Sequence, residues 1–355
     1  MNESKTGTSD SYMPQLDALR AFAVASVAYS HWIPEKYHFG LPWGSGGVRL
    51  FFVLSGFLIT GILLRCREHG DLLFAARAFY ARRFLRIFPL FYAVLLIAVI
   101  LNIRPVRATL PWHMSYLSNF YFFCNQGWDG PISHFWSLAV EEQFYLFWPA
   151  VILCLPNRYI GACIVGLIVT GVLSRLFLDQ VFPGVKLLNV LPNANFDSLG
   201  LGSLLALVAA REFKDSRVRW LIAGVPIYIV LFAIRNLGFA LPFHRGCEHL
   251  AILLSFTWLV NAASTGFNGL SKTFLELPML LYLGRISYGV YVLHNFASLP
   301  VRFLADIVGF PNLQFGISGI VLMTIFTIGG ASLSWHCFET PINKLKQRFP
   351  YKIPV

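Results

Sequence analysis

The sequence predicts an all-α protein that crosses a membrane many times as one helical bundle. Of its 355 residues, 56% are hydrophobic and only 13% are charged, whereas soluble domains carry about 25% charged residues. Mean hydropathy is +0.62. Apolar runs long enough to span a bilayer recur along the whole chain, near residues 16–34, 46–65, 86–103, 133–155, 159–179, 195–211, 217–236, 245–263, 277–299 and 313–337.

These ten spans predict one membrane domain over residues 15–345, with a polar, disordered tail over residues 1–14 and a second tail over residues 346–355. If the N-terminus is cytoplasmic, 17 Lys and Arg residues fall in inner segments and 7 in outer segments. This bias predicts that both termini lie in the cytoplasm. It also explains the net charge of +11 without a nucleic-acid partner. No cleaved signal peptide is expected at the N-terminus.

The six cysteines form no C-x-x-C pair, so no metal or redox motif is expected. Cys124 and Cys247 are the only two expected on the outer side. They are therefore the only pair that an oxidising compartment could join, although isolated cysteines in membrane proteins are usually free.

The first span places three ionisable residues in an apolar run, LDALRAFAVASVAYSH. Arg20 and His31 lie eleven residues apart, which is about three helical turns, so they share a face at a separation of roughly 16 Å. Ionisable groups within spans usually serve function. The structural alternative is that Arg20 reaches lipid headgroups and His31 only bonds to a neighbouring helix.

The second span contains Gly47, Ser55 and Gly56, small residues that let helices approach closely. An amphipathic, Arg-rich connection follows and is expected to lie along the inner interface. It ends with Arg83 and Arg86, which are three residues apart on one helical face and suit a phosphate. The alternative for this pair is ordinary positive-inside charge.

The outer connection over residues 104–132 is the longest and is rich in aromatic residues, which either anchor at the interface or wall a substrate entrance. These are Trp112, Tyr116, Phe120, Tyr121 and Trp128.

The fourth span carries Glu141 and Glu142 about two turns from its start. A carboxylate at that depth must be paired, protonated or hydrated. His31 is expected to reach a comparable depth, so a His–Glu pair could fix the tautomer of the imidazole. A purely structural bond between the two helices is the alternative.

Later spans add further polar groups. Asp197 lies in the sixth span, and Tyr288, Tyr291 and His294 follow one another at intervals of three in the ninth. This spacing puts the three side chains on one face, where they could line a polar cavity. For the two tyrosines, a packed aromatic face is an equal alternative.

In its order of motifs, the chain resembles the membrane-bound acyltransferase 3 family, whose members O-acylate O-antigen, Nod factors, exopolysaccharides and macrolides. The resemblance covers essentially the whole chain and matches the stand-alone form, since no C-terminal SGNH-type hydrolase domain is seen. It lies in LDALRAFAV with YSH, then GVRLFFVLSGFLI, RRFLRIFP, HFWSLAVEEQFYLFWP, RISYGVYVLH and FETP.

The resemblance implies a role for several residues. Arg20 and His31 match the family's Arg-x10-His pair, with His31 catalytic. Arg83 and Arg86 match the Arg-x-x-Arg motif, which engages the acyl donor from the cytoplasm. Glu141 matches the first Glu of WSLxxE and would orient the imidazole. The expected donor site is Arg20, Arg83 and Arg86, and the expected substrate site is Asp17, Ser55, Tyr288 and His294.

Two residues depart from the family pattern. Ala18 replaces the usual Gly after Asp17, and Asn195 stands where an Arg often precedes the Phe-Asp of the sixth span. The second departure puts substrate contacts near Asp197 in question, not the chemistry.

The resulting hypothesis is a multi-pass enzyme of the bacterial inner membrane that transfers an acyl group, preferably acetyl, from cytoplasmic acyl-CoA to a carbohydrate hydroxyl. Acyl-CoA is a co-substrate, and no tightly bound cofactor is expected. Membrane lipid and a second copy of the chain are the other partners considered. Rival hypotheses are a proton-coupled transporter or flippase and a non-catalytic receptor. Neither rival would consume a thioester.

Overall fold

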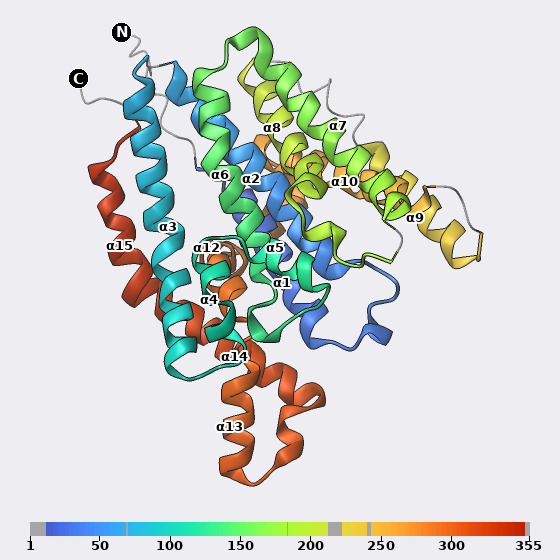
Figure 1. Ribbon diagram of the computed structural model, residues 1–355, viewed down its shortest axis with the longest axis vertical. Coiled ribbons are helices and arrows are strands. Elements are labelled where there is room, and N and C mark those ends of the chain that lie inside the picture. Colours follow the sequence, from blue (N-terminus) through green and yellow to red (C-terminus); the bar gives the residue numbers. More distant parts are fainter. Residues whose placement is uncertain (1–11, 69, 183, 212–221, 240–242, 352–355) are drawn as a thin grey trace.

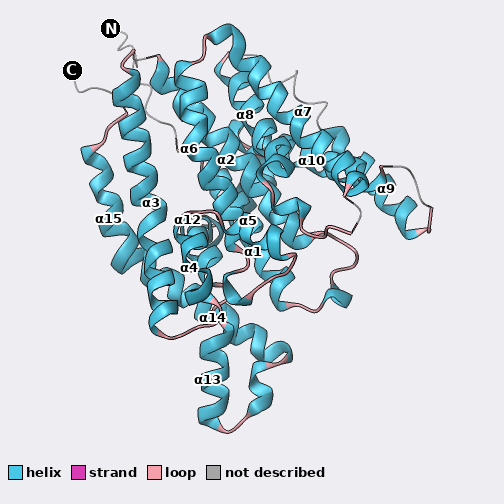
Figure 2. Ribbon diagram, viewed as in Figure 1, coloured by secondary structure: helices cyan, strands magenta, loops and turns pink. Residues whose placement is uncertain are grey.

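The computed structural model describes residues 12–68, 70–182, 184–211, 222–239 and 243–351. In this part of the chain the regular structure is helical throughout and no strand occurs (Figure 2). Each of the ten expected spans overlaps a helix, and residues 217–221 of the span expected over 217–236 lie outside the described part of the chain. They are α1 Pro14–Trp32, α2 Trp43–Arg67, α3 Leu72–Ile100, α6 Phe135–Cys154, α7 Asn157–Val181, α8 Phe196–Ala210, α9 Gly224–Asn236, α10 His244–Thr265, α12 Pro278–Leu293 and α14 Gly316–Ser334.

Five stretches of the described chain are long and apolar enough to cross a membrane, so the protein is a multi-pass membrane protein. They are α2, α3, α7 up to Leu178, α10 and the stretch Gly316–Arg348 that contains α14. The central helices α8 and α12 have only 15 and 16 residues. Ten crossings and their orientation therefore stay predictions.

Helix α1 lies in the middle of the bundle, between α2 and α12, and α2 packs in turn against α8. These contacts are close because glycines form them. A Cβ on Gly284 of α12 would lie 2.0 Å from the Asp17 carbonyl oxygen of α1, and one on Gly56 of α2 would lie 2.1 Å from that of Leu199 in α8. The small residues of the second span therefore serve helix packing, as expected.

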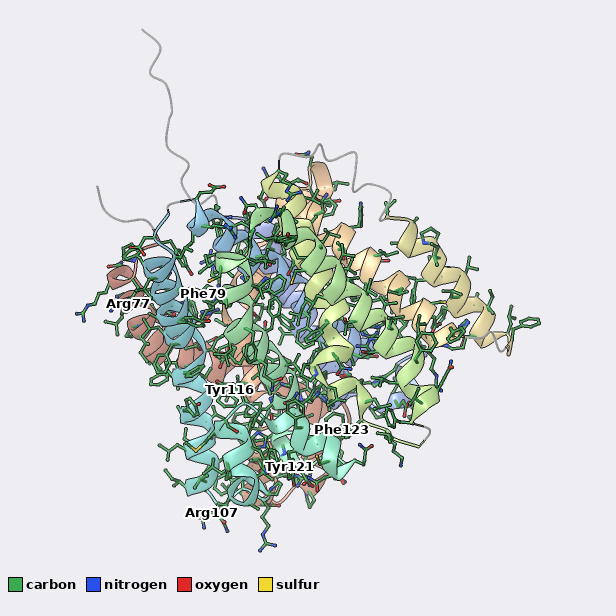
Figure 3. The ribbon with its side chains drawn as sticks, turned by 45° about the horizontal axis from the view of Figure 1, so that its top comes forward. Arg77, Phe79, Arg107, Tyr116, Tyr121 and Phe123 are labelled. Carbon is green, nitrogen blue, oxygen red and sulfur yellow. The ribbon has the colours of Figure 1, made fainter. Side chains whose placement is uncertain are left out.

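Helix α3 differs from the expectation of a separate interfacial segment, because it continues without a break from Leu72 to Ile100 through Pro89. Its 29 residues make a rod of about 43 Å. The Asp71 side chain caps its start by accepting from the Phe74 amide at 2.9 Å. Arg77 is exposed on the outer edge of this helix, whereas Phe79 is buried (Figure 3).

Both ends of the described chain lie at the same end of the bundle (Figure 1). Arg82, near the start of α3, donates to the Lys346 and Phe349 carbonyls at 3.0 Å each. Its guanidinium also lies 4.5 Å above the Tyr351 ring. Two ends on one side are what an even number of crossings requires.

Short helical segments fill the connections. The aromatic connection folds into two of them, where Tyr116 stacks on Phe91 of α3 at 4.6 Å and is buried. Tyr116 is thus part of the core, whereas Trp112 and Trp128 remain exposed. The short helices are α4 Val106–Met114, α5 Ser118–Asn125, α11 Gly269–Leu275, α13 Ser298–Val308, α15 Thr340–Lys344, a π-helix η8 over Trp335–Glu339, and the 3-10 turns η1 Glu35–Tyr37, η2 Gly130–Ile132, η3 Leu188–Val190, η4 Pro192–Asn195, η7 Pro311–Gln314 and η9 Leu345–Arg348.

None of the six cysteines forms a disulfide, and Cys124 and Cys247 are both exposed. The disulfide considered for this pair is therefore not formed.

Candidate functional site

A cavity enclosed by α1, α2, α3, α6 and α12 brings together most of the residues singled out in the sequence. We call it the central cavity. Arg20, in the first half of α1, and Arg83 and Arg86, near the middle of α3, line one end of it. Further along, its wall is formed by Ser55, Ser137, Glu141, Tyr145, Ser287, Tyr288 and Tyr291, together with apolar residues of α2, α3 and α6.

Arg20 is held in place by Asp17, one helical turn earlier. The distance from Arg20 Nη1 to Asp17 Oδ1 is 2.7 Å, and the other Asp17 oxygen accepts from the Tyr12 hydroxyl at 2.7 Å. Asp17 is only 6% exposed. It therefore orients the Arg20 guanidinium, and a contact of Asp17 with substrate stays a prediction.

Arg83 and Arg86 are held chiefly by aromatic rings. The Arg83 guanidinium lies 5.7 Å from the Tyr145 ring, and that of Arg86 lies 5.1 Å from the Trp335 ring. Arg86 donates to the Arg285 carbonyl at 3.3 Å. Because ring contacts leave N–H groups unused, these guanidinium groups can still bind an anion. Arg82 differs, since its Nη1 donates to two carbonyls of the C-terminal segment.

The middle of the central cavity is polar on one wall. Glu141 accepts hydrogen bonds from the hydroxyls of Ser55 and Tyr145, and these two hydroxyl oxygens lie 3.0 Å apart. The three groups tie α2 to α6 and face the space between the arginines and Tyr291. Tyr288, on the opposite wall, donates to the Ile87 carbonyl at 2.6 Å.

The far end of the cavity is lined by Tyr291, which hydrogen-bonds to Ser137 and donates to the His134 carbonyl at 3.1 Å. Its ring centroid lies 5.6 Å from that of His294. Of the face formed by Tyr288, Tyr291 and His294, the two tyrosines line the cavity and His294 lies directly behind them.

Three histidines from α1, α12 and the start of α6 meet beyond Tyr291. His31 Nδ1 and His294 Nε2 are 2.8 Å apart, and the His134 ring lies 4.5 Å from that of His294. His294 is 0% exposed and His134 is 3% exposed, whereas His31 is exposed. His31 is therefore the member of this cluster that an external molecule can reach.

The hydrogen bonds fix the tautomers of two of these rings. His294 Nδ1 lies 2.6 Å from the Tyr291 carbonyl, which can only accept, so Nδ1 carries the proton. In the neutral ring, His294 Nε2 is then an acceptor, and His31 Nδ1 must donate to it. The lone pair of His31 is therefore left on Nε2, the nitrogen that a base or nucleophile would use.

The pair suggested between His31 and Glu141 is not the one that forms. His31 lies at the level of His134, the residue before α6, whereas Glu141 is seven residues further along the chain, or about 10 Å. The sequence estimate of equal depth was therefore wrong by about two helical turns. His134 had been given no role, although it stands in the same HFWSLAVEE run as Glu141.

Known proteins resemble this chain over nearly its whole length. The profile of a family described as an acyltransferase domain matches residues 13–336. The "Peptidoglycan O-acetyltransferase OatA" of Listeria monocytogenes is 30% identical over 372 residues, covering 96% of this chain and 57% of OatA. YrhL of Bacillus subtilis, named as a provisional peptidoglycan O-acetyltransferase, is 29% identical and covers 94% of this chain and 55% of its own length. This chain thus spans little more than half the length of these curated relatives. No solved structure matches it.

Proposed function

This chain belongs to the acyltransferase 3 family, and we propose that it is a membrane O-acetyltransferase that moves an acetyl group from acyl-CoA to a carbohydrate hydroxyl. One observation carries this proposal. Arg20 and His31 lie on one helix, Arg20 at the cationic end of the central cavity and His31 beyond its far end, next to His294.

The donor is proposed to bind at the cationic end. Arg20, Arg83 and Arg86 put three guanidinium groups around one opening, and phosphates are the ligands that guanidinium groups bind best. Acyl-CoA carries a pyrophosphate and a further phosphate, so its nucleotide would stay at this end. The acyl chain would extend past Ser55 and Glu141 toward Tyr291. If the predicted orientation holds, this opening faces the cytoplasm.

The acceptor is proposed to approach from the other end. The relatives' names give peptidoglycan as the substrate of those proteins, and for this chain we propose a hydroxyl of a cell-envelope glycan. The exposed His31 would take the hydroxyl proton on Nε2 while the acceptor oxygen attacks the thioester carbon. The carbon–sulfur bond then breaks, and CoA leaves as the thiolate.

His294 would support this step as a positioning residue. When His31 gains a proton on Nε2, its Nδ1–H remains donated to His294 Nε2, so the imidazolium keeps a hydrogen-bond acceptor. A second route, in which His31 Nε2 first takes the acetyl group as acetyl-imidazole, uses the same lone pair.

Labelled acetyl-CoA supplied to the purified protein in lipid nanodiscs, together with cell-envelope glycans, tests the proposal. His31→Ala should abolish labelling of the glycan without loss of folding, and general-base catalysis is typically worth about 10²–10⁴ in rate. His38→Ala, in the loop that follows α1, is the matched control and should keep wild-type labelling. Normal turnover in His31→Ala, or no consumption of the thioester by the wild type, would overturn the proposal.

A further inference from the structure

A second cavity, separate from the central one, is lined by basic side chains. We call it the basic cavity. It lies between α2, α7, α10 and the segment before α8, and the basic residues in its wall are Arg49, Arg175, Lys186, Arg245 and His249. Helices α7 and α10 lie on one flank of the bundle, beside the more central α2 and α8 (Figure 1).

A network of hydrogen-bonded polar side chains forms the base of this cavity. Asp197, the first acidic residue of α8, is 0% exposed and lies 2.7 Å from His249 Nε2 and 3.4 Å from Arg175 Nε. Its other oxygen accepts from the Ser198 amide at 2.7 Å and the Ser198 hydroxyl at 3.1 Å. Asp197 is therefore fully engaged, and its effect is to hold Arg175 and His249 in fixed positions.

Arg175 supplies a positive charge next to the position where this chain has Asn195 instead of an arginine. Where the family often has an arginine before Phe-Asp, this chain has Asn195, whose side-chain oxygen accepts from Arg175 Nη2 at 3.2 Å. The guanidinium beside Asp197 is thus supplied from α7, and the positive charge at this place is kept.

The described side chains that line the basic cavity are mostly cationic. Lys186 and Arg245 are exposed at its mouth, while the Arg175 side chain is 13% exposed at its base and bonds to Asp197. With Arg49, four permanently charged cations line one space. Cations brought together out of water repel one another and lose hydration, and an anion between them removes both costs.

The basic cavity lies at the same end of the bundle as His31. Arg49 is near the start of α2, which follows His31 after a short loop, and Arg175, near the end of α7, and Arg245, near the start of α10, line the same cavity as Arg49. Helix α2 connects the two places, because a Cβ on its residue Gly44 would lie 2.4 Å from the hydroxyl of Ser30, the neighbour of His31.

We propose that the basic cavity binds a carboxylate or phosphate group of the acceptor, while the acceptor hydroxyl lies at His31. The proposal rests on the proposed function for the direction from which the acceptor comes. The anion would belong either to the sugar itself or to a lipid that carries it. In both cases the preferred acceptor is anionic, and a neutral glycan would bind weakly.

Binding measurements on the purified protein in phosphatidylcholine nanodiscs separate these sources. Trigalacturonate is the sugar-carboxylate probe, and its methyl ester is the neutral control. A polyprenyl phosphate in the nanodisc, against the free polyprenol, is the lipid probe. The variants are Arg49→Gln and Arg245→Gln, with Arg158→Gln, exposed near the opposite end of α7, as the matched control.

We expect at least one anionic probe to bind more tightly than its neutral control. Its Kd should rise about tenfold or more in each variant, as for a lost charge-assisted hydrogen bond, and stay unchanged in Arg158→Gln. Arg245 is exposed, so its variant remains informative if Arg49→Gln unfolds. Kd values that are equal in wild type and Arg245→Gln for both probes would overturn the proposal. Acetyl-CoA binding is measured alongside. Loss of anion binding with intact acetyl-CoA binding supports a separate acceptor site, whereas absence of acetyl-CoA binding from the wild type would contradict the proposed function and leave the anion result standing.

Discussion

Replacement of His294 is the sharpest test of the histidine geometry, because this ring is 0% exposed and lies next to the exposed His31. His294→Phe keeps the size of the side chain and removes the Nε2 acceptor that lies 2.8 Å from His31 Nδ1. His31 would then enter the reaction with its Nδ1–H unpaired.

The size of the effect follows from the charge that develops. A neutral hydrogen bond contributes about 0.5–1.5 kcal/mol, and one to a charged group about 1.5–3 kcal/mol. Because His31 becomes positively charged as it takes the acceptor proton, the stronger bond is lost in the transition state. His294→Phe should therefore lower kcat by about 10- to 150-fold. His294→Gln, whose amide oxygen can still accept, should recover part of the loss.

The assay is the rate of acetyl transfer from labelled acetyl-CoA, with the thermal unfolding temperature measured for each variant. In the His31→Ala background, adding His294→Phe should cause no further loss, because the two residues act as a unit. His38→Phe controls for the loss of an imidazole elsewhere. A kcat of His294→Phe within twofold of wild type, in a folded protein, would refute the assigned tautomers and the supporting role.

Four further predictions follow from the rest of the molecule. Arg83→Ala should raise KM for acetyl-CoA with a smaller effect on kcat, whereas Arg77→Ala, at an exposed position of the same helix, should leave KM unchanged. If KM is the same in wild type and Arg83→Ala, Arg83 does not bind the donor and only contributes positive charge to the inner side. Glu141→Gln should lower acetyl transfer less than His31→Ala, because the structure places Glu141 in the wall of the central cavity and not on the imidazole; a loss as complete as that of His31→Ala would show that the carboxylate itself reacts. With the predicted orientation, the exposed Cys124 should react with an impermeant maleimide in intact cells, and protection until lysis would reverse the topology. Burial lowers the pKa of His113, in the connection before α6, to about 4. As the pH falls below 6.5, the unfolded chain therefore binds a proton at His113 that the folded chain does not, and the free energy of unfolding should fall by up to about 1.4 kcal/mol per pH unit. His113→Phe should flatten the dependence of Tm on pH between 6.5 and 4.5.

The positions of the helices could be predicted because apolar runs of span length are a strong signal, and α1 begins and ends within two residues of the expected 16–34. The prediction that Arg20 and His31 lie on one helix, about three turns apart, is also confirmed, since residues on one helix have a fixed geometry. The same is true of Arg83 and Arg86, which share one turn and one cavity.

Relations between helices were harder to predict. The depth of Glu141 relative to His31 depends on how far α1 and α6 slide past one another, and no local pattern in the sequence encodes that offset. The partner of His31 lies 263 residues away, and Arg175 reaches Asp197 from a different helix. Contacts of this kind are set by packing between helices, and glycines such as Gly56 of α2, Gly171 of α7 and Gly284 of α12 mark some of the places where the helices meet.

The contact between α2 and α8 gives the molecule a mechanical property. Gly56 faces the Leu199 carbonyl and Gly202 faces the Val53 carbonyl, with no room for a Cβ at either place. The two helices must therefore move as one rigid body. That body forms a partition with a chamber on each side, since α2 contributes Ser55 to the central cavity and Arg49 to the basic cavity. A tilt of this partition would therefore change the width of both chambers at once, because α2 cannot move relative to α8.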